Sequence, residues 1–343
     1  MKRILLSILA IVLIVGAVVA LWGYQKLFSD NVADGAAEFI EVPTGSSFDQ
    51  LVGILRGEGV LEDVRSFEMT AQLMKYDGGT IRAGRFAIDP KASNVALIRH
   101  LRGGKQAPVD VVLTGGRMPE NVAAKAARFI EPDSVEIEAA MRDTTLLREL
   151  GYTPETLMSM LIPNTYELFW NTDAEAFLRR MKKEHDRFWD KENRRAKAAE
   201  LKLTPAEVYT MASIIEKETN NNGEKKRMAG VYLNRLKIGM LLQADPTSVF
   251  ATKDFMTRRV TNYHTEFDSP YNTYKYAGLP PGPIAMASIP SIDAVLNAED
   301  HDYLYFVAKG DETGTHNYAK SLAGHNRNIV IYKRNLRKRG IRR

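Results

Sequence analysis

The sequence predicts an α+β fold, made of an N-terminal transmembrane helix, a small α+β module and a larger mixed α/β domain. Three observations support this class. Ile4 to Trp22 is an uncharged, largely apolar run of about 19 residues, close to the length that spans a membrane. Beyond it, short strand-like runs alternate with segments of helical periodicity. The 343 residues, 45% of them hydrophobic and 26% charged, are enough for two domains with cores of their own.

Residues 1–23 are expected to form a retained membrane anchor. Lys2 and Arg3 precede the apolar run, which predicts a cytoplasmic N-terminus and export of everything after Trp22. A cleaved signal peptide is the alternative, since Val18 to Ala20 resembles a cleavage site, but the run is longer than the usual signal core. The absence of cysteine suits an exported protein. We therefore expect a single-pass protein of the cytoplasmic (inner) membrane whose remainder lies on the periplasmic or extracytoplasmic side.

Residues 24–37 are expected to form a polar stalk, and residues 38–113 a small α+β module. Ser93 is expected to cap one helix of the module, which Gly103 and Gly104 end. The expected order of elements is a strand at 39–42, a helix from Phe48, a helix at about 64–74, a strand at 85–88, a helix after Ser93 and a strand at 109–113.

Residues 114–200 are expected to form a mainly helical connecting region. An aromatic segment, Leu161 to Trp170, interrupts the helical pattern and is expected to be a loop. Arg179 to Lys202 is densely charged and has few apolar positions. This composition indicates an exposed helix that bridges the two halves of the chain.

A helix beginning at Thr204 opens the last predicted domain, residues 201–332. Thr204 supplies a capping hydroxyl, Pro205 stands at the first helical position, and Glu207 lies three residues past the cap. Asn220 to Gly223 is expected to end the helix. Apolar residues recur at helical spacing and define its packed face: Val208, Met211, Ala212, Ile214 and Ile215.

Glu218 continues this apolar stripe, because it lies four residues after Ile214 and three after Ile215. Glu216 lies well round the helix and is expected to be exposed. A carboxyl group held among apolar side chains keeps its proton to higher pH, as a general acid requires. The alternative for Glu218 is an ordinary place at a frayed last turn, solvated or paired with a lysine.

The rest of this domain is expected to contain a second helix, 224–237, and then a long irregular region. Turn-rich segments lie at 243–248, 269–274 and 278–284, and loops this long within a compact domain usually carry function. Three elements close the domain: a strand at 303–308, a strand near 316–318 and a helix from about Ser321.

The candidate binding residues are polar and aromatic. No metal site or other cofactor is expected, because the histidines are scattered, His-x-x-x-His is absent and cysteine is lacking. His264, His316 and His325 are open as residues that line a site, but a lone histidine is more often structural than functional. Carboxylates, amides and tyrosines remain, which is the usual inventory of a carbohydrate site. Seven of them lie in the turn-rich segments: Gln243, Asp245, Thr247, Tyr271, Asn272, Thr273 and Tyr274. Taken singly, each is better explained by turn chemistry.

A reaction that needs one carboxylic acid suits this inventory. Ordinary glycosidases use two carboxylates across the scissile bond, and side chains two apart on a helix, such as Glu216 and Glu218, do not face each other. Asp245 and Asp268 are open as partners, but neither has comparable apolar surroundings. One acid suffices where the substrate supplies its own nucleophile. The C6 hydroxyl of a muramic acid does so when it attacks its own C1 and gives a 1,6-anhydro product.

Residues 333–343 are expected to form a basic tail, which contributes to the formal net charge of +5. Such a run is open to nucleic acid binding. Outside the cytoplasm, solvation or loose contact with anionic lipid or wall polymer is the better expectation, so no nucleic acid partner is expected.

Several ordered motifs resemble the endolytic murein transglycosylases of the MltG/YceG-like family, and the resemblance covers nearly the whole chain. They are Ala-Ser-Ile-Ile-Glu-Lys-Glu-Thr (212–219), Val-Tyr-Leu-Asn-Arg-Leu (231–236), Leu-Gln-Ala-Asp-Pro-Thr (242–247), Tyr-Asn-Thr-Tyr (271–274), Gly-Leu-Pro-Pro-Gly-Pro-Ile (278–284) and Tyr-Leu-Tyr-Phe-Val (303–307). The resemblance implies a LysM-like module at 38–113 and a catalytic domain at 201–332. The basic extension and the segment 161–166 depart from the family pattern.

The resemblance implies a lyase that cleaves the MurNAc–GlcNAc bond of nascent peptidoglycan strands, leaves 1,6-anhydro-MurNAc ends and limits strand elongation. It implies Glu218 as the single catalytic acid and base, with Glu216 as the fallback, and Gln243, Asn272 and Thr273 as groups that hold the substrate. Expected partners are glycan strands and peptidoglycan synthases (penicillin-binding proteins). Two alternatives stay open: a non-catalytic peptidoglycan-binding scaffold of the wall-synthesis machinery, and a hydrolase that uses water as its nucleophile.

Overall fold

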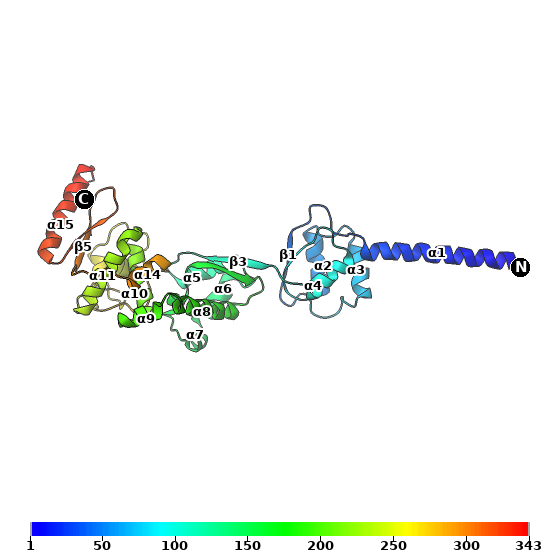
Figure 1. Ribbon diagram of the computed structural model, residues 1–343, viewed down its shortest axis with the longest axis horizontal. Helices are drawn as coiled ribbons and strands as arrows, with labels where there is room; N and C mark the ends of the chain where they lie inside the picture. The colour runs from blue at the N-terminus through cyan, green and yellow to red at the C-terminus, as the bar shows by residue number, and fades with distance from the viewer. Residues whose placement is uncertain (1, 342–343) are drawn as a thin grey trace. The chain divides into compact units, whose positions relative to one another are not determined.

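The computed structural model describes residues 2–341, which fall into two compact units. Unit 1 runs to Val111 and also takes in Phe129–Pro132 and Glu167–Asp173, whereas unit 2 comprises the remaining segments up to the C-terminal helix. Met1 of the expected anchor, and Arg342 and Arg343 of the expected basic tail, lie outside the described residues. Helices combined with small two-stranded sheets confirm the α+β class (Figure 1).

Unit 1 joins a long N-terminal helix to a small module. Its elements are α1 (Lys2–Phe28), β1 (Phe39–Val42), α2 (Phe48–Gly57), α3 (Val64–Leu73), β2 (Gly84–Ala87) and α4 (Asn94–Gly103), followed by β3 (Pro108–Leu113), which crosses into unit 2. β1 and β2 pair antiparallel, with Ile40 opposite Phe86. The module's core gathers both of these residues with Leu51, Phe67 and Ile98, all of them fully buried. Ser93 caps α4, as expected, because its hydroxyl accepts a hydrogen bond from the amide of Ala96.

The end of α1 packs against this module. Among residues 2–341, only the helix that contains Arg3–Phe28 is long and apolar enough to cross a membrane. The Lys26 ammonium lies 2.6 Å from Asp63 Oδ2, and Asn94 Nδ2 donates to the carbonyl of Lys26 at 2.9 Å. The last turn of the apolar helix is therefore fixed to the module by an ion pair and a hydrogen bond.

The expectation of a polar stalk at 24–37 was wrong. α1 continues to Phe28, and the residues after it join the module. Val32 belongs to the module's core, and Asn31 is buried with its amide hydrogen-bonded to Asn94 at 2.7 Å. The polar composition of this segment supplies internal hydrogen bonds, which a composition count cannot distinguish from contacts with water.

Unit 2 is mainly helical. Its elements are α5 (Pro119–Ala126), α6 (Ser134–Arg142), α7 (Thr144–Leu150), a 3-10 turn η1 (Leu157–Met160), β4 (Asn164–Phe169), α8 (Ala174–Asp190), α9 (Arg194–Glu200), α10 (Pro205–Glu218), α11 (Asn222–Lys237), α12 (Asp245–Thr252), α13 (Asn262–Glu266), α14 (Ile289–Leu296), β5 (Tyr305–Ala308), β6 (His316–Ala319) and α15 (Leu322–Lys338). β4 pairs with β3, and the division between the units falls within both strands. The aromatic segment expected to be a loop is therefore mostly a strand.

The expected exposed bridging helix at 179–202 is also corrected. The segment forms two helices, α8 and α9, which both lie in unit 2 and are separated at Asn193, where φ is +56°. α8 buries Phe177, Met181 and Trp189 along one face, while its charged residues pair on the other. Those pairs raise the charge density of the segment without removing its apolar stripe.

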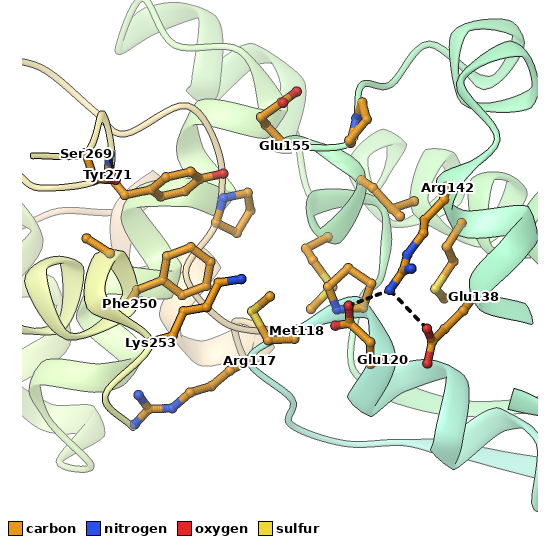
Figure 2. Close-up of a pocket in the computed structure, with 17 residues that line it drawn as sticks. Arg117, Met118, Glu120, Glu138, Arg142, Glu155, Phe250, Lys253, Ser269 and Tyr271 are labelled. Carbon is orange, nitrogen blue, oxygen red and sulfur yellow. Dashed lines mark hydrogen bonds and ion pairs between the residues drawn. The ribbon is translucent and has the colours of Figure 1, made fainter. Parts of the chain in front are cut away.

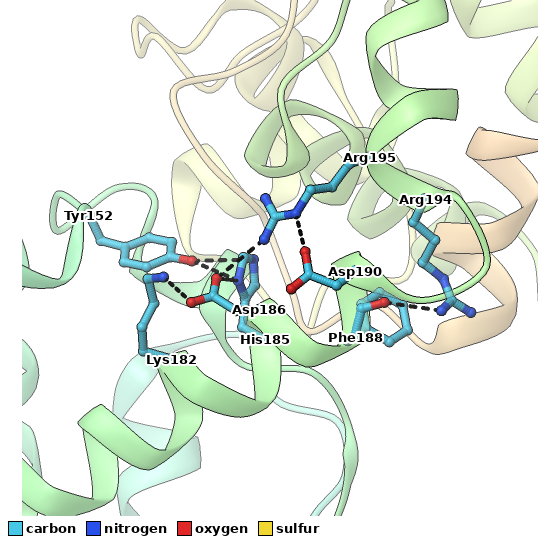
Figure 3. Close-up of polar contacts among 8 residues, drawn as sticks. All are labelled: Tyr152, Lys182, His185, Asp186, Phe188, Asp190, Arg194 and Arg195. Carbon is cyan, nitrogen blue, oxygen red and sulfur yellow. Dashed lines mark hydrogen bonds and ion pairs between the residues drawn. The ribbon is translucent and has the colours of Figure 1, made fainter.

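Figure 3 shows a polar network on α8 that includes a buried histidine. His185 lies 3.2 Å from the hydroxyl of Tyr152 and from Asp186 Oδ1, and Asp186 also pairs with Lys182. Burial lowers the pKa of His185 to about 4, so the ring is neutral near pH 7. This histidine has the structural role expected of a lone histidine.

α10 is the central helix of unit 2. Every residue from Val208 to Ile215 is buried, so the helix packs on all sides and not only on the apolar face that its sequence pattern predicts. The Tyr209 hydroxyl donates to the carbonyl of Leu161 at 2.7 Å and accepts from the amide of Ala287 at 3.1 Å. The α10 core also includes Trp189 from α8. Segments distant in sequence thus hold α10 in place.

Two further expectations are corrected in unit 2. The turn-rich segment 243–248 begins α12, because Asp245 and Pro246 occupy the first helical turn. The basic residues from Lys333 belong to α15, whose Leu336 is buried and whose Asn335 donates to the carbonyl of Lys309 at 2.7 Å. Residues 333–338 of the expected tail are therefore the end of a packed helix.

Candidate active site

The helix that ends at Glu218 is specified locally at its start. Thr204 Oγ1 accepts from the amide of Glu207 at 3.2 Å, and Glu207 Oε2 accepts from the amide of Thr204 at 2.7 Å. This capping box and the proline at the first helical position confirm the expected beginning of α10. The helix ends at Glu218, and Thr219 is already extended, with φ −146° and ψ 138°. Glu218 therefore stands at the last turn of a helix that is otherwise enclosed.

The Glu218 carboxyl is held by one phenol. Tyr232, fully buried on α11, donates to Glu218 Oε1 at 2.9 Å. The pKa of Glu218 is raised to about 7, chiefly by burial; the Tyr232 hydrogen bond lowers it, and the negative charge of Asp245 adds to the rise. The residue is partly exposed, so a carboxyl that is half protonated near neutral pH faces open space.

That space is a cleft of about 300 Å³ in unit 2. Its lining comes from α10, α11, the start of α12, β5 and α15: Glu218, Arg235, Leu242, Gln243, Asp245, Tyr274, Tyr305, Phe306, Leu322 and His325. Residues more than 100 positions apart in the sequence meet here. Of the seven expected binding residues, the structure places Gln243, Asp245 and Tyr274 beside Glu218.

Gln243 and Asp245 enter the cleft from one segment, two residues apart. Gln243 is exposed and has a left-handed backbone, with φ +48°, and its amide donates to the carbonyl of Thr273 at 3.0 Å. Asp245 Oδ1 accepts from the hydroxyl of Tyr274 at 2.5 Å. A strained backbone that surrounding contacts maintain is a common feature of binding sites.

Thr247, Asn272 and Thr273 do not line the cleft, and all three are buried. Asn272 Nδ2 donates to the carbonyls of His264, Thr265 and Phe267, and the hydroxyls of Thr247 and Thr273 are 2.8 Å apart. Their polar groups are satisfied within the protein. They hold the loops that carry Gln243 and Tyr274, and the expectation that Asn272 and Thr273 hold the substrate stays a prediction.

Tyr271 lies outside the Glu218 cleft. Its ring centroid is 4.8 Å from that of Phe250, and both rings line a separate recess of unit 2. The Tyr-Asn-Thr-Tyr segment therefore contributes its first tyrosine to one recess, its last to the other and its two central residues to the core between them.

Glu216, the fallback for the catalytic residue, is not an exposed neighbour. Its Oε2 accepts from Ser288 and Ser291, each at 2.5 Å, and from the buried Lys225 ammonium at 3.1 Å. Burial opposes ionisation of Glu216, but these donors outweigh it and hold its pKa below the ordinary value of 4.5. Glu216 is an ionised residue that ties α10 to α11 and α14.

Several residues of the cleft were not singled out by sequence reasoning. Arg235 is buried and donates to the carbonyls of Leu241, Leu242 and Leu304, which fixes the two chain segments beside the cleft. Tyr305 stacks on His325, with ring centroids 5.3 Å apart, and burial lowers the pKa of His325. Tyr232 and Arg235 lie within the motif at 231–236, and that motif is the sequence feature from which their place at the site could have been predicted.

Other histidines and possible metal ligands do not form a second centre. His264 lies 3.1 Å from Asp254 and His316 lies 3.0 Å from Glu224, and neither lines the cleft. Within residues 2–341, no group of three or more His, Asp or Glu side chains is placed to hold a metal ion. The chemistry available in the cleft is proton transfer by a carboxyl group, with amide, phenol and aromatic contacts around it.

Comparisons with known proteins agree on one family. The pattern of the YceG-like family matches residues 40–330. A Bacillus subtilis (strain 168) protein named endolytic murein transglycosylase is 31% identical over 305 residues, which is 84% of this chain and 82% of that protein. A Streptococcus pneumoniae (strain D39) protein of the same name is 27% identical and is matched over 57% of its length, with 85% of this chain covered. The crystal structure of a YceG-like protein from Listeria monocytogenes superimposes with a TM-score of 0.56 and 29% identity, over 84% of this chain and 98% of that one. The chain therefore belongs to the YceG-like family.

Proposed function

We propose that this protein is an endolytic lytic transglycosylase that cleaves the MurNAc–GlcNAc bond within nascent peptidoglycan strands and leaves 1,6-anhydro-MurNAc ends, which limits strand elongation. The observation that carries this proposal is Glu218, a carboxyl group with a pKa raised to about 7 that opens into a cleft of about 300 Å³. The names of the relatives from Bacillus and Streptococcus support the same substrate and reaction.

In this mechanism Glu218 acts twice. Protonated Glu218 gives its proton to the glycosidic oxygen while the bond from that oxygen to C1 of MurNAc breaks. The resulting carboxylate takes the proton of the C6 hydroxyl, whose oxygen forms the new bond to C1. Glu218 is then protonated again, so no water is consumed and atoms balance. A pKa near the working pH lets one group serve as acid and then as base.

The surrounding groups have positioning roles in this proposal. Tyr232 holds Oε1 and leaves the second oxygen of Glu218 free for the substrate. Gln243 and Tyr274 offer an amide and a phenol to sugar hydroxyl and acetamido groups, while Thr247, Asn272 and Thr273 hold the loops in place. Aromatic rings such as Tyr305 present flat faces on which sugar rings stack.

The compartment and the partners form part of the proposal. α1 anchors the chain in the cytoplasmic membrane with its N-terminus inside, and unit 2 acts outside on strands that peptidoglycan synthases are elongating. The module at 38–113 is LysM-like and contacts glycan. Lys2 and Arg3 before the apolar helix support this orientation, and the length of the helix supports a retained anchor. A membrane-bound mature protein that still begins at its first residues would support the anchor over a cleaved signal peptide.

Asp245 supports a second candidate function, a hydrolase. Its carboxylate lies in the same cleft as Glu218 and raises the pKa of Glu218. Two carboxyl groups across a glycosidic bond are the usual arrangement for hydrolysis, in which one of them activates a water molecule. The hydrogen bond from Tyr274 already occupies one oxygen of Asp245, which favours a positioning role over that of a base.

One experiment separates these functions. The full chain in detergent is incubated with uncrosslinked glycan strands, and the new ends are identified by mass spectrometry. Anhydro ends support the transglycosylase, whereas free reducing ends support the hydrolase. Retained binding without any cleavage would overturn both and leave the non-catalytic scaffold. If Glu218→Gln still formed anhydro ends while Glu216→Gln did not, the residue assignment would be wrong.

A further inference from the structure

Unit 2 has a second recess, larger than the Glu218 cleft, which the proposed chemistry does not use. It measures about 420 Å³ and lies between α12 with the segment at 269–271 on one side and α5 with α6 on the other (Figure 2). Phe250, Tyr271 and Met118 give it an apolar floor. Its rim carries charged groups: Arg117, Glu120, Glu138, Arg142, Glu155 and Lys253.

The two sides of this recess have opposite charge. On the α12 side, Lys253 points into the space, whereas the guanidinium of Arg117 is directed away from it and stands over the ring of Phe255, 4.8 Å from its centroid. Neither cation has an ion-pair partner among the described residues. Burial lowers the pKa of Lys217, and the positive charge of the nearby Arg117 lowers it further. Lys253 is therefore the cation that faces the recess from this side.

The opposite side carries excess negative charge. Arg142 pairs with Glu120 at 3.0 Å and with Glu138 at 3.1 Å, so two carboxylates share one guanidinium. Glu155 adds a further carboxylate at the edge of the recess, near Tyr271; it accepts the neutral hydroxyl of Thr153 at 2.7 Å, and this hydrogen bond holds its pKa below the ordinary range. A ligand that complements both sides needs an anionic group, a cationic group and apolar atoms between them.

The recess lies within reach of a substrate bound at Glu218. α12 begins at Asp245 in the catalytic cleft and is capped by Lys253 at the recess, a separation of about 12 Å at 1.5 Å per residue. A peptide of five residues spans up to about 17 Å when extended. The separation along α12 is therefore shorter than a five-residue peptide attached to a sugar in the cleft.

We propose that this recess binds the stem peptide of an uncrosslinked glycan strand, with a peptide carboxylate at Lys253 and the free side-chain amine of the diamino acid at Glu155, while Glu120 and Glu138 add negative charge. The inference rests on the proposed function, because the peptide is carried by the muramic acid that Glu218 would cleave. Crosslinking acylates that amine and removes its charge. The recess thus distinguishes nascent strands from crosslinked ones.

The test compares three substrates with the full chain in detergent: strands whose stem peptides have a free amine, the same strands after acetylation of the amine, and strands from which the peptides have been removed. Lys253→Gln and Glu155→Gln each remove one charge and keep a polar side chain. Lys237→Gln is the matched control, since Lys237 is exposed and lines neither recess. Calorimetry with the free stem pentapeptide measures binding independently of cleavage.

We expect kcat/KM on peptide-bearing strands to fall about threefold to tenfold in Lys253→Gln and Glu155→Gln, as for the loss of one charge-assisted contact, with no change on peptide-free strands. Acetylation should lower the wild-type rate similarly and make Glu155→Gln indistinguishable from wild type. Equal losses on peptide-free strands would mean that the recess holds sugar, and unchanged rates on every strand would mean that it holds nothing; both overturn the proposal. Pentapeptide binding that Lys253→Gln weakens, without cleavage of any strand, would support the recess and reject the proposed function.

Discussion

The buried phenol of Tyr232 donates a 2.9 Å hydrogen bond to Oε1 of Glu218, fourteen residues earlier in the chain. This contact joins the end of α10 to the middle of α11 and fixes the orientation of the carboxyl group at the cleft. It also works against burial, because it stabilises the ionised form of Glu218 while its surroundings stabilise the neutral form. The acidity of Glu218 is set by the balance between the two.

The first prediction concerns this hydrogen bond. Tyr232→Phe should raise the pKa of Glu218 by up to about one unit, because a hydrogen bond to a charged group contributes about 1.5 kcal/mol. The decline of kcat/KM at high pH should therefore move to higher pH. Tyr209→Phe is the control, since it removes a buried hydroxyl from the same core without touching Glu218. A profile that moved equally in both variants would assign the effect to general loosening of the core.

The second prediction is the pH dependence of the unmodified protein. Cleavage needs protonated Glu218, so kcat/KM should be flat below about pH 6 and fall roughly tenfold per unit above about pH 7. Initial rates of anhydro-end formation between pH 5 and 9, at constant ionic strength, give the profile. A decline centred near 4.5, the ordinary pKa of glutamate, would rule out the buried acid as the group that titrates.

The third prediction separates the role of Glu218 in catalysis from its effect on the stability of the folded protein. Glu218→Gln should lower kcat about 10²-fold to 10⁴-fold, the usual contribution of a general acid. Because the folded protein raises the pKa of this carboxyl, its ionisation destabilises the fold progressively from about pH 4.5 to about pH 7 and fully above that. The variant should therefore be more stable than wild type at pH 8, by at most about 3 kcal/mol, and equal to it at pH 4. Thermal unfolding at both pH values checks this, and a loss of stability at pH 8 would contradict it.

The fourth prediction assigns Glu216 to folding. Glu216→Gln leaves the buried Lys225 ammonium without its partner and should reduce the free energy of unfolding by about 3 kcal/mol at pH 7. The pKa of Glu216 is depressed, so its contribution is complete above about pH 4.5 and is lost as the pH falls through the lower folded-state value. Denaturant unfolding at pH 7 and at pH 3 measures the difference. Glu200→Gln, at an exposed position on α9, is the control and should change neither value.

The fifth prediction distinguishes loop support from substrate contact. Asn272→Ala removes the donor of three hydrogen bonds to backbone carbonyls and should lower the unfolding free energy by about 2–3 kcal/mol. Gln243→Ala removes an exposed amide and should raise KM several-fold while leaving stability within about 0.5 kcal/mol. Unfolding curves and steady-state rates on the same two proteins decide between these roles. A change in KM for Asn272→Ala at unchanged stability would return Asn272 to the substrate site.

Much of the fold could be predicted from local sequence, because helix caps and helical phase depend on residues close together in the chain. The capping box of Thr204 and Glu207 set the start of α10, and the phase of Ile214 and Ile215 placed Glu218 on the packed side. The errors occurred where partners are distant. The charge density at 179–202 concealed the buried face of α8, and the polar residues around Asn31 gave no sign that their partners lie on α3 and α4.

The sequence by itself determined the α+β class, the long apolar helix and the family, and it singled out Glu218 among the acids. Only the tertiary structure decided what surrounds each carboxyl group. Glu216 meets Ser288 and Ser291 more than 70 residues away and is ionised, whereas Glu218 meets Tyr232, loses much of its hydration to the surrounding protein and holds its proton to about pH 7. The two side chains are chemically identical. Their acidity differs because desolvation and hydrogen bonding depend on neighbours that folding, and not sequence proximity, brings together.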